Sequence, residues 1–289
     1  MRELPITGHT RLACLLGHPV AHSVSPQMHN ESFAFHGLDC RYLAFDVTPE
    51  RFGAAVDGLI AMNAMGWNCT MPHKRRMFER VDVRSEEAEL IGAVNTVVQE
   101  NGVLTGYNTD GKGYMTAVKD AGFDLAGKKM TILGTGGAAA SIMTQAALDG
   151  LPGIDVIARK GESWNAVEQV ADRINGRTDC KVAMYELRDE TQMRKSIGES
   201  GILVNASSVG MSPDEDGCLV PDRSFLHPEL IVSDVIYEPR RTKLLRMAES
   251  AGCQVCNGMY MLLYQGAYAF ELWTGLPMPV EQVKEKYFR

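Results

Sequence analysis

Four short polar segments interrupt the apolar stretches of the first 111 residues, at positions 22–26, 68–74, 92–96 and 108–111. The first segment carries Ser23 and Ser25 directly before Pro26. Hydroxyls and unpaired backbone N–H groups at the start of a helix can bind a carboxylate. The other three segments supply asparagine and threonine, which suit a polyol, together with Lys74 and Asp110. As a set, the segments predict a site for a small polar ligand that carries a carboxylate.

Each segment also has a purely structural interpretation. Ser25 can cap a helix, Asn95 and Asp110 can occupy turns, and Lys74 can be a surface lysine that follows a proline. For any one motif in isolation the structural interpretation is favoured. The functional interpretation gains from the order of the segments and from a nucleotide-binding motif further along the chain.

That motif is a glycine-rich turn at residues 134–139, Gly-Thr-Gly-Gly-Ala-Ala, which matches G-x-G-x-x-G/A. An apolar strand pattern precedes it and an alanine-rich helix pattern follows it, which is the context that a dinucleotide turn requires. Glycines there allow a tight turn and a close approach to a pyrophosphate at the helix N-terminus. The alternative is a glycine turn in some other α/β protein. The pattern predicts cofactor contacts at Gly134, Gly136, Gly137 and Ala138.

The choice between NAD and NADP depends on residues about twenty positions beyond this turn. Here Arg159 and Lys160 come first, and the only acid, Glu162, follows a glycine. Arginine and lysine suit the 2′-phosphate of NADP, whereas an acid would suit the 2′-hydroxyl of NAD. The order of these residues favours NADP and leaves NAD open. A solvated charged turn is the structural alternative.

Short apolar runs alternate with helical patterns, which predicts an α/β fold with largely parallel sheets. The first part of the chain predicts a helix over 25–35, with Ser25 as its N-cap, and strands at 11–17, 42–47, 66–70, 93–99 and 103–107. The later strands predict a doubly wound nucleotide domain, and they fall at 130–133, 154–158, 182–185, 202–205 and 231–235. Helices over about 260–270 and from 280 onward end the chain.

Composition limits the classes of protein to which this chain can belong. A net charge of −7 without a basic stripe argues against a nucleic-acid partner. Seven scattered cysteines suit reduced thiols in a cytoplasm, and the pair Cys253 and Cys256 is expected on a buried strand rather than at a metal. The N-terminus lacks signal-peptide features, and no apolar run reaches membrane-spanning length. We therefore expect a cytoplasmic protein with no metal and no membrane partner.

The ordered segments resemble those of the shikimate dehydrogenase and quinate/shikimate dehydrogenase family nearly end to end. The resemblance continues through residues 205–207, 234–239, 257–262 and 265–267. It implies a substrate domain over 1–110, completed by about 261–289, and a Rossmann-type domain over 111–260. It also implies reversible oxidation of shikimate to 3-dehydroshikimate, and possible action on quinate, by hydride transfer to a nicotinamide cofactor.

The same resemblance assigns roles to individual residues. Ser23, Ser25 and Tyr237 would hold the substrate carboxylate. The ring hydroxyls would meet Thr70, Lys74, Asn95, Asp110 and Gln265. The nicotinamide side would be lined by Asn205, Ser207, Val235, Gly258 and Met261. Lys74 would act as general base in oxidation and general acid in reduction, with Asp110 orienting it. His22 and His73 are rivals for that role, although each is better suited to ordering its loop.

The chain departs from the family pattern beside the ribose position, where Ala158, Lys160 and Gly161 replace residues that commonly mark one cofactor or the other. Related dehydrogenases for quinate or an amino analogue of shikimate are the nearest alternatives, because one ring substituent separates them. A non-catalytic NAD(P)-sensing protein is a further alternative, but it would not need the Lys74 and Asp110 pair. A dehydrogenase of folate-like substrates does not suit the two serines. The chain is compatible with a monomer or a homodimer.

Overall fold

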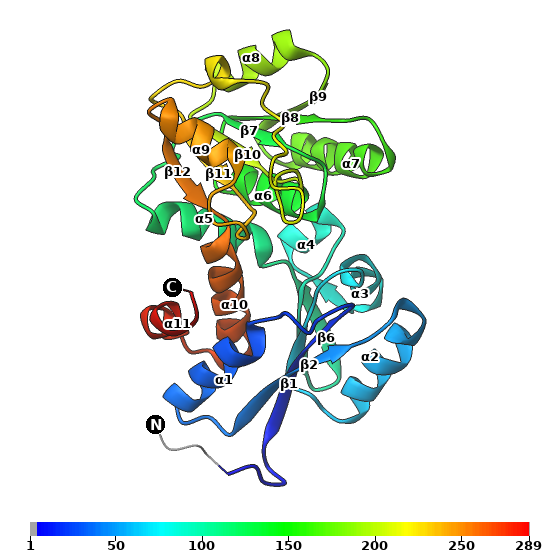
Figure 1. Cartoon of the computed structure of the whole chain (residues 1–289). Helices are drawn as coiled ribbons and strands as arrows, with labels where there is room; N and C mark the ends of the chain where they lie inside the picture. The colour runs from blue at the N-terminus through cyan, green and yellow to red at the C-terminus, as the bar shows by residue number, and fades with distance from the viewer. Residues whose placement is uncertain (1–4, 289) are drawn as a thin grey trace. The chain divides into compact units, whose positions relative to one another are not determined.

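The computed structural model describes residues 5–288, so residues 1–4, which entered the signal-peptide prediction, and residue 289 lie outside the described residues. The chain divides into two compact units, each built around its own six-stranded sheet (Figure 1). The first unit runs to Thr109 and resumes at Leu263, and the second comprises Asp110–Leu262. The predicted α/β class is confirmed, including the return of the C-terminal helices to the first unit.

The sheet of the first unit has the strand order β2-β1-β3-β5-β6-β4. Its strands are β1 Arg11–Gly17, β2 Cys40–Asp46, β3 Gly66–Cys69, β4 Val83–Arg84, β5 Thr96–Glu100 and β6 Val103–Tyr107. The first three strands are parallel, whereas β5 pairs antiparallel with both β3 and β6. Asn101 and Gly102 join β5 to β6 with φ of 51° and 81°, the left-handed values that a two-residue hairpin turn needs. The carboxyl ends of β1 and β3 point to one edge, where the polar segments collect.

Helices cover this sheet and close its core. They are α1 Ser25–Phe35, α2 Phe52–Ala61 after the short 3₁₀ turn Pro49–Arg51, α3 Lys74–Arg80, α4 Glu86–Ile91, α10 Met259–Thr274 and α11 Val280–Tyr287. The indole Nε1 of Trp273 in α10 donates to the carbonyl of Val97 at 2.9 Å. Gly66 lies against this contact, and a side chain there would collide with the indole and with the Val97 carbonyl. The last helices therefore complete the first unit.

The sheet of the second unit is wholly parallel, with the order β12-β11-β10-β7-β8-β9. Its strands are β7 Met130–Leu133, β8 Gly153–Ala158, β9 Lys181–Glu186, β10 Ile202–Asn205, β11 Ile231–Asp234 and β12 Gln254–Asn257. Its helices are α5 Asp110–Asp120, α6 Gly137–Leu148, α7 Glu162–Arg177, α8 Glu190–Gly198 and α9 Lys243–Ser250, with a 3₁₀ turn at Arg223–Phe225. The strand order reverses between β7 and β10, where such sheets bind their nucleotide.

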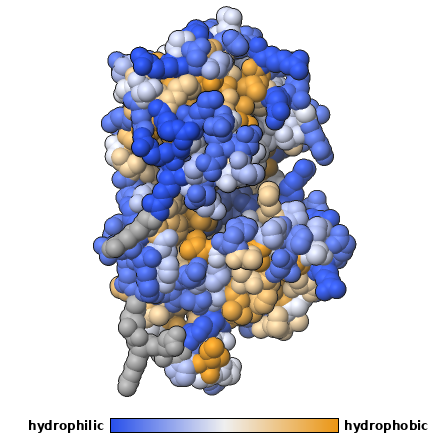
Figure 2. All heavy atoms as spheres, in the orientation of Figure 1, coloured by the Kyte–Doolittle hydropathy of each residue, from blue (hydrophilic) through white to orange (hydrophobic). Residues whose placement is uncertain are grey.

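The burial of the strands agrees with this arrangement, except at β12. All residues of β7, β10 and β11 are buried, as expected for strands covered on both faces. The strand at Cys256, predicted to be buried, is instead a partly exposed edge strand, and Cys253 precedes it with its thiol donating to the His227 carbonyl. On the face in Figure 2, hydrophilic residues predominate and hydrophobic residues form separate groups. Among residues 5–288 no helix is long and apolar enough to cross a membrane.

Candidate active site

The two serines lie at the N-terminal end of α1. Ser25 was predicted as the N-cap, but Val24 occupies that position without a side-chain cap bond, and Ser25 is the first helical residue. The Ser23 hydroxyl accepts a hydrogen bond from the Ser25 N–H at 3.3 Å. Ser25 is buried, and its side chain forms a hydrogen bond with the Tyr42 phenol. Burial raises the pKa of Tyr42, and this hydrogen bond opposes the rise.

From Tyr42 a chain of hydrogen bonds runs across the strands of the first unit and links residues of three polar segments. The Tyr42 hydroxyl donates to Asn68 Oδ1 at 2.7 Å, and Asn68 Nδ2 donates to Thr96 Oγ1 at 3.0 Å. Thr96 donates in turn to Asn95 Oδ1 at 2.9 Å. Asn95 Nδ2 donates to Thr109 Oγ1 at 2.9 Å, and the Thr109 N–H returns a bond to Asn95 Oδ1 at 2.9 Å. We call the residues Ser25, Tyr42, Asn68, Asn95, Thr96 and Thr109 the buried polar network.

The buried polar network fixes the orientation of its members. None of the six side chains is more than 6% exposed. Burying polar groups is costly unless they are hydrogen-bonded, so each amide and hydroxyl is held to the geometry that satisfies its neighbours. The network joins β2, β3, β5 and the residue before Asp110. The structure therefore brings three of the four predicted polar segments, and Ser25 from the fourth, into one connected arrangement.

Lys74 is the first residue of α3, which begins one turn after β3 ends. Its carbonyl accepts the Val94 N–H at 2.9 Å, which ties α3 to the segment that leads into β5. Its side chain is half-buried. Burial raises the pKa of the Cys69 thiol, and the Lys74 ammonium opposes that rise, which places the charge near the end of β3. Thr70 lies between β3 and α3. Its N–H donates to the Leu16 carbonyl of β1, and its own carbonyl accepts the His73 N–H.

The two rival histidines differ from Lys74 in their surroundings. His73 is fully buried, its Nε2 donates to the Val47 carbonyl at 2.6 Å, and its ring stacks on Phe52 at 4.5 Å between centroids. Burial lowers the pKa of His73. His22 is exposed. These contacts give His73 a role in packing the loop and favour Lys74 as the proton-transfer group.

The remaining predicted substrate residues lie on three different elements. Asp110 is buried and begins α5, and Gly111 beside it allows α5 to touch the Ser141 carbonyl of α6. Gln265 is half-buried on α10 in the first unit. Tyr237 follows β11 in the second unit and is 45% exposed. A common site for these residues and the two serines stays a prediction.

The glycine turn after β7 fits a dinucleotide. Gly134 has φ of +116°, and a Cβ there would lie 3.0 Å from the Ala206 carbonyl, so the turn requires glycine. Gly136 occupies the N-cap position of α6, with Gly137 and Ala138 in its first turn. Gly136 and Gly137 are exposed, and nothing lies within 4 Å of a Cβ added at Gly137. The start of α6 is therefore exposed, as a helix N-terminus that binds a pyrophosphate must be.

A second buried cluster forms where β10 and β11 end, and it holds the loops that follow these two strands. Asn205 Nδ2 donates to Asp234 Oδ1 at 3.0 Å, and Asn205 Oδ1 accepts the Ser207 hydroxyl at 2.7 Å. Asp234 also accepts the Ile236 N–H at 3.0 Å and the Thr242 hydroxyl at 2.8 Å. Burial raises the pKa of Asp234 although these hydrogen bonds oppose it. The family resemblance predicts Asn205 beside the nicotinamide, and in the structure its amide also holds these loops.

Three more residues predicted beside the nicotinamide lie close to these loops. The Val235 N–H donates to the Asn205 carbonyl at 3.0 Å. Gly258 lies against the Val235 backbone so closely that a Cβ would collide with it. Met261, in the first turn of α10, lines a cavity of about 260 Å³ together with Tyr114 and Cys256.

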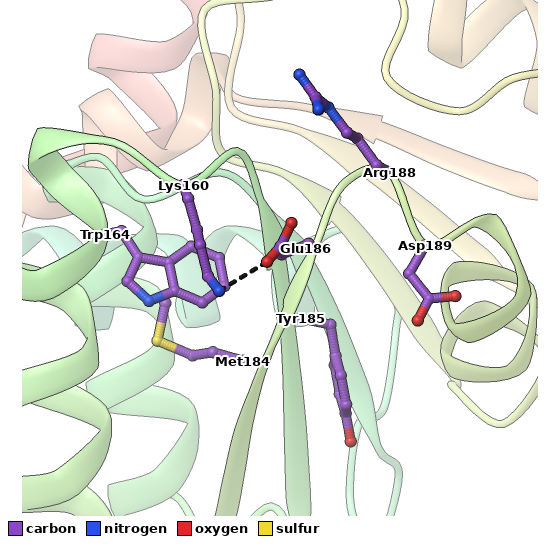
Figure 3. Close-up of a pocket in the computed structure, with 7 residues that line it drawn as sticks. All are labelled: Lys160, Trp164, Met184, Tyr185, Glu186, Arg188 and Asp189. Atoms are coloured by element: carbon purple, nitrogen blue, oxygen red, sulfur yellow. Dashed lines mark ion pairs between the residues drawn. The ribbon is translucent and has the colours of Figure 1, made fainter.

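The residues predicted to choose the cofactor lie where β8 and β9 end. A cavity of about 480 Å³ opens there (Figure 3), lined by Lys160, Trp164, Met184, Tyr185, Glu186, Arg188 and Asp189. Lys160 Nζ forms an ion pair with Glu186 Oε1 at 2.6 Å and lies 5.8 Å from the centre of the Trp164 ring. The hydrogen bond with Glu186 raises the pKa of Lys160. Arg159 and Glu162 are exposed and do not line this cavity.

No group of three or more histidine, cysteine, aspartate or glutamate residues within 5–288 is arranged to hold a metal ion. The polar side chains of the candidate site offer hydrogen bonding, charge and proton transfer. The buried polar network and Lys74 supply these beside β3, and the glycine turn supplies a cradle for a dinucleotide.

Comparisons with known proteins agree with this geometry. Residues 15–97 match the model of the shikimate dehydrogenase substrate binding domain, and residues 258–286 match that of the shikimate 5′-dehydrogenase C-terminal domain. A curated relative named shikimate dehydrogenase (NADP(+)), from Listeria monocytogenes serotype 4b (strain F2365), is 52% identical over 98% of this chain and 97% of its own.

Solved structures give the same result. A crystal structure of shikimate 5-dehydrogenase from Listeria monocytogenes, in complex with shikimate and NAD, is 51% identical and superposes with a TM-score of 0.95 over 98% of each chain. A shikimate dehydrogenase crystallised with NADP⁺ is 35% identical, with a TM-score of 0.87 over 97% of this chain and 96% of its own. The chain belongs to the shikimate dehydrogenase family.

Proposed function

We propose that this chain is a shikimate dehydrogenase that reversibly oxidises shikimate to 3-dehydroshikimate with NADP as its preferred cofactor. The observation that carries the proposal is the buried polar network, which orients Asn95 beside the segment that bears Lys74. The 52% identity to a relative named shikimate dehydrogenase (NADP(+)) supports the substrate and the cofactor.

In this proposal Ser23 and Ser25 bind the substrate carboxylate at the N-terminal end of α1, where backbone N–H groups add positive character. Tyr237 completes the binding of the carboxylate. Asn95, Thr70 and Gln265 contact the ring hydroxyls. Because Asn95 is held by Thr96 and Thr109, its amide does not need to reorganise when substrate arrives.

Oxidation of a secondary alcohol removes a hydride from carbon and a proton from oxygen. The nicotinamide ring, when bound, takes the hydride. Lys74 Nζ accepts the hydroxyl proton as the carbonyl forms, and returns it during reduction. Asp110 shares the hydrogen bond of that hydroxyl and keeps it aligned with Lys74. The loops held by Asn205 and Asp234, together with Ser207, Val235, Gly258 and Met261, shape the nicotinamide side.

The test is a matrix of initial rates followed at 340 nm, with shikimate and quinate each crossed with NADP⁺ and NAD⁺. We expect the highest kcat/KM with shikimate and NADP⁺. Higher kcat/KM with quinate would move the chain to a quinate-preferring enzyme. Cofactor binding without turnover of either acid would contradict the proposed activity and favour an NAD(P)-sensing role. A cytoplasmic location and a monomeric or homodimeric state stay predictions.

A further inference from the structure

Lys160, predicted to bind the 2′-phosphate, already has an anionic partner. Its Nζ lies 2.6 Å from Glu186 Oε1, and Figure 3 shows the two side chains turned toward each other with the Trp164 ring beside the lysine. The pairing follows from the sheet, because the β8–β9 register places Glu186 opposite Ala158, two residues before Lys160. A second acid, Glu168, adds a weaker attraction for the same lysine.

The location of this pair matters for the cofactor. In doubly wound domains the ribose 2′ position is recognised just beyond the second strand, which is β8 here. A phosphate monoester carries between one and two negative charges near neutrality, whereas the 2′-hydroxyl of NAD is neutral. A carboxylate at this position therefore repels NADP but not NAD, and it competes with the phosphate for Lys160.

The exposure of the pair keeps it open to competition. The side chains of Lys160 and Glu186 are 64% and 49% exposed. Exposed ion pairs are weak, since solvent screens them and their side chains lose entropy. A 2′-phosphate can therefore displace Glu186 from Lys160, but it must do so against a charge that stays nearby.

We propose that Glu186 is a specificity-determining residue that restrains NADP preference by holding Lys160 and repelling a 2′-phosphate, so that the chain accepts both NADP and NAD. This inference rests on the proposed function for its biological setting, but it concerns only nucleotide binding. Glu186 lies on β9, outside the segments from which sequence patterns select a cofactor.

The test measures dissociation constants by isothermal titration calorimetry for NADP⁺, NAD⁺ and adenosine 2′,5′-bisphosphate at low salt. Glu186→Gln removes the charge and keeps the shape. We expect the dissociation constants of the two 2′-phosphorylated nucleotides to fall about three- to fivefold, the upper part of the range for one exposed charge pair. The constant for NAD⁺ should stay within about twofold, because its 2′-hydroxyl carries no charge.

Two controls separate the pair from general electrostatics. Asp189→Asn makes the same charge change in the same cavity, but Asp189 caps α8 and does not pair with Lys160, so its effect on NADP⁺ should be smaller. In a Lys160→Met background, Glu186→Gln should keep only the part of its effect that comes from direct repulsion of the phosphate, so its effect on NADP⁺ should be smaller than in the unsubstituted chain.

The outcomes distinguish this inference from the proposed function. Unchanged NADP⁺ affinity in Glu186→Gln, an equal change for NAD⁺, or an undiminished effect in the Lys160→Met background would each overturn the role of Glu186. The proposed function fails separately, through absent shikimate turnover by the unsubstituted chain, which the binding measurements do not require.

Discussion

The buried polar network of the first unit and the charged pocket at the ends of β8 and β9, the two regions proposed to bind ligands, are built in opposite ways. The network consists of short side chains, each at most 6% exposed, whose hydrogen bonds run from strand to strand. The pocket relies on a long lysine and a glutamate that are about half exposed or more. A ring with several hydroxyls must be held in one orientation, whereas a phosphate can be selected by charge alone. Substitutions should therefore cost far more in the network than in the pocket.

The largest effect should come from Lys74→Ala, which removes the proposed general base. We expect kcat to fall by about 10²–10⁴, the range for loss of a general acid–base, with a smaller change in KM. Steady-state kinetics of shikimate oxidation measures both. Arg75→Ala is the matched control, since Arg75 is an exposed cation on the same helix. An unchanged kcat in Lys74→Ala would remove Lys74 from the mechanism.

Asn68→Ala should come next, because it breaks the network at its centre. The Tyr42 hydroxyl would lose its acceptor, and Thr96 would lose a donor. Leaving buried polar groups unpaired costs about 1–3 kcal/mol each, so the free energy of unfolding should fall by about 2–6 kcal/mol and KM for shikimate should rise. Denaturant unfolding and kinetics provide the readouts, with the exposed Asn165→Ala as the control. Equal stability of the two variants would contradict the rigidity that we ascribe to the network.

A pair of glycine substitutions tests the nucleotide side of the comparison. Gly134→Ala should lower the free energy of unfolding by about 1–3 kcal/mol, because φ of +116° is strained for alanine and the Cβ meets the Ala206 carbonyl. Gly137→Ala should leave it within about 0.5 kcal/mol, since this first helical residue has open space around it. Thermal unfolding of the nucleotide-free variants compares them. Similar losses in both would show that the turn tolerates no side chain anywhere.

His29 is a buried polar side chain of the first unit that lies outside its hydrogen-bond network. It is completely buried, stacks on Tyr42 at 4.4 Å, and neither ring nitrogen has a hydrogen-bond partner. Burial lowers the pKa of His29 from 6.5 to about 3. Between these values the unfolded chain binds a proton that the folded chain does not, so stability is full above pH 6.5 and falls as the pH drops.

This histidine should therefore contribute a slope of at most about 1.4 kcal/mol per pH unit to acid destabilisation. His29→Phe preserves a ring in the aromatic cluster and removes the titrating group. We expect its free energy of unfolding to fall less than that of the unsubstituted chain between pH 6.5 and 4.5. If the free energy of unfolding falls equally in the two proteins between pH 6.5 and 4.5, His29 is not the source of the acid destabilisation.

Much of the fold follows from local patterns. The predicted strands at 11–17, 130–133 and 202–205 coincide with β1, β7 and β10, because continuous apolar runs bounded by turn residues leave little choice. The hairpin turn at Asn101 and Gly102 follows from local chemistry, because this residue pair adopts the left-handed φ values that such a turn needs. Helix α3 was not predicted, since Lys74–Arg80 is short and mostly charged, with little apolar periodicity. The antiparallel pairing of β3 with β5 depends on tertiary packing and has no local signal.

The candidate site was predictable to a different degree in each unit. Asn68, Thr96 and Thr109 lie in the polar segments that drew attention, but Tyr42 was identified only as part of a strand, because an alternating pattern does not reveal which hydroxyl is buried. Asp234 and Thr242 meet across a loop, and Glu186 reaches Lys160 through the register of two strands. Such contacts join residues that are distant in the sequence and depend on how strands and loops pack, so local sequence patterns do not predict them.

The return of the chain to the first unit has a consequence for its synthesis. The ribosome makes β1 to β6 first, then the whole of the second unit, and only then α10, whose Trp273 donates to the Val97 carbonyl. At about 5–20 residues per second, roughly 150 intervening residues take about 8–30 seconds. During that interval the place of Trp273 beside Gly66 stays open. The nascent first unit is therefore most vulnerable to misassembly while the second unit of the same chain is still being translated.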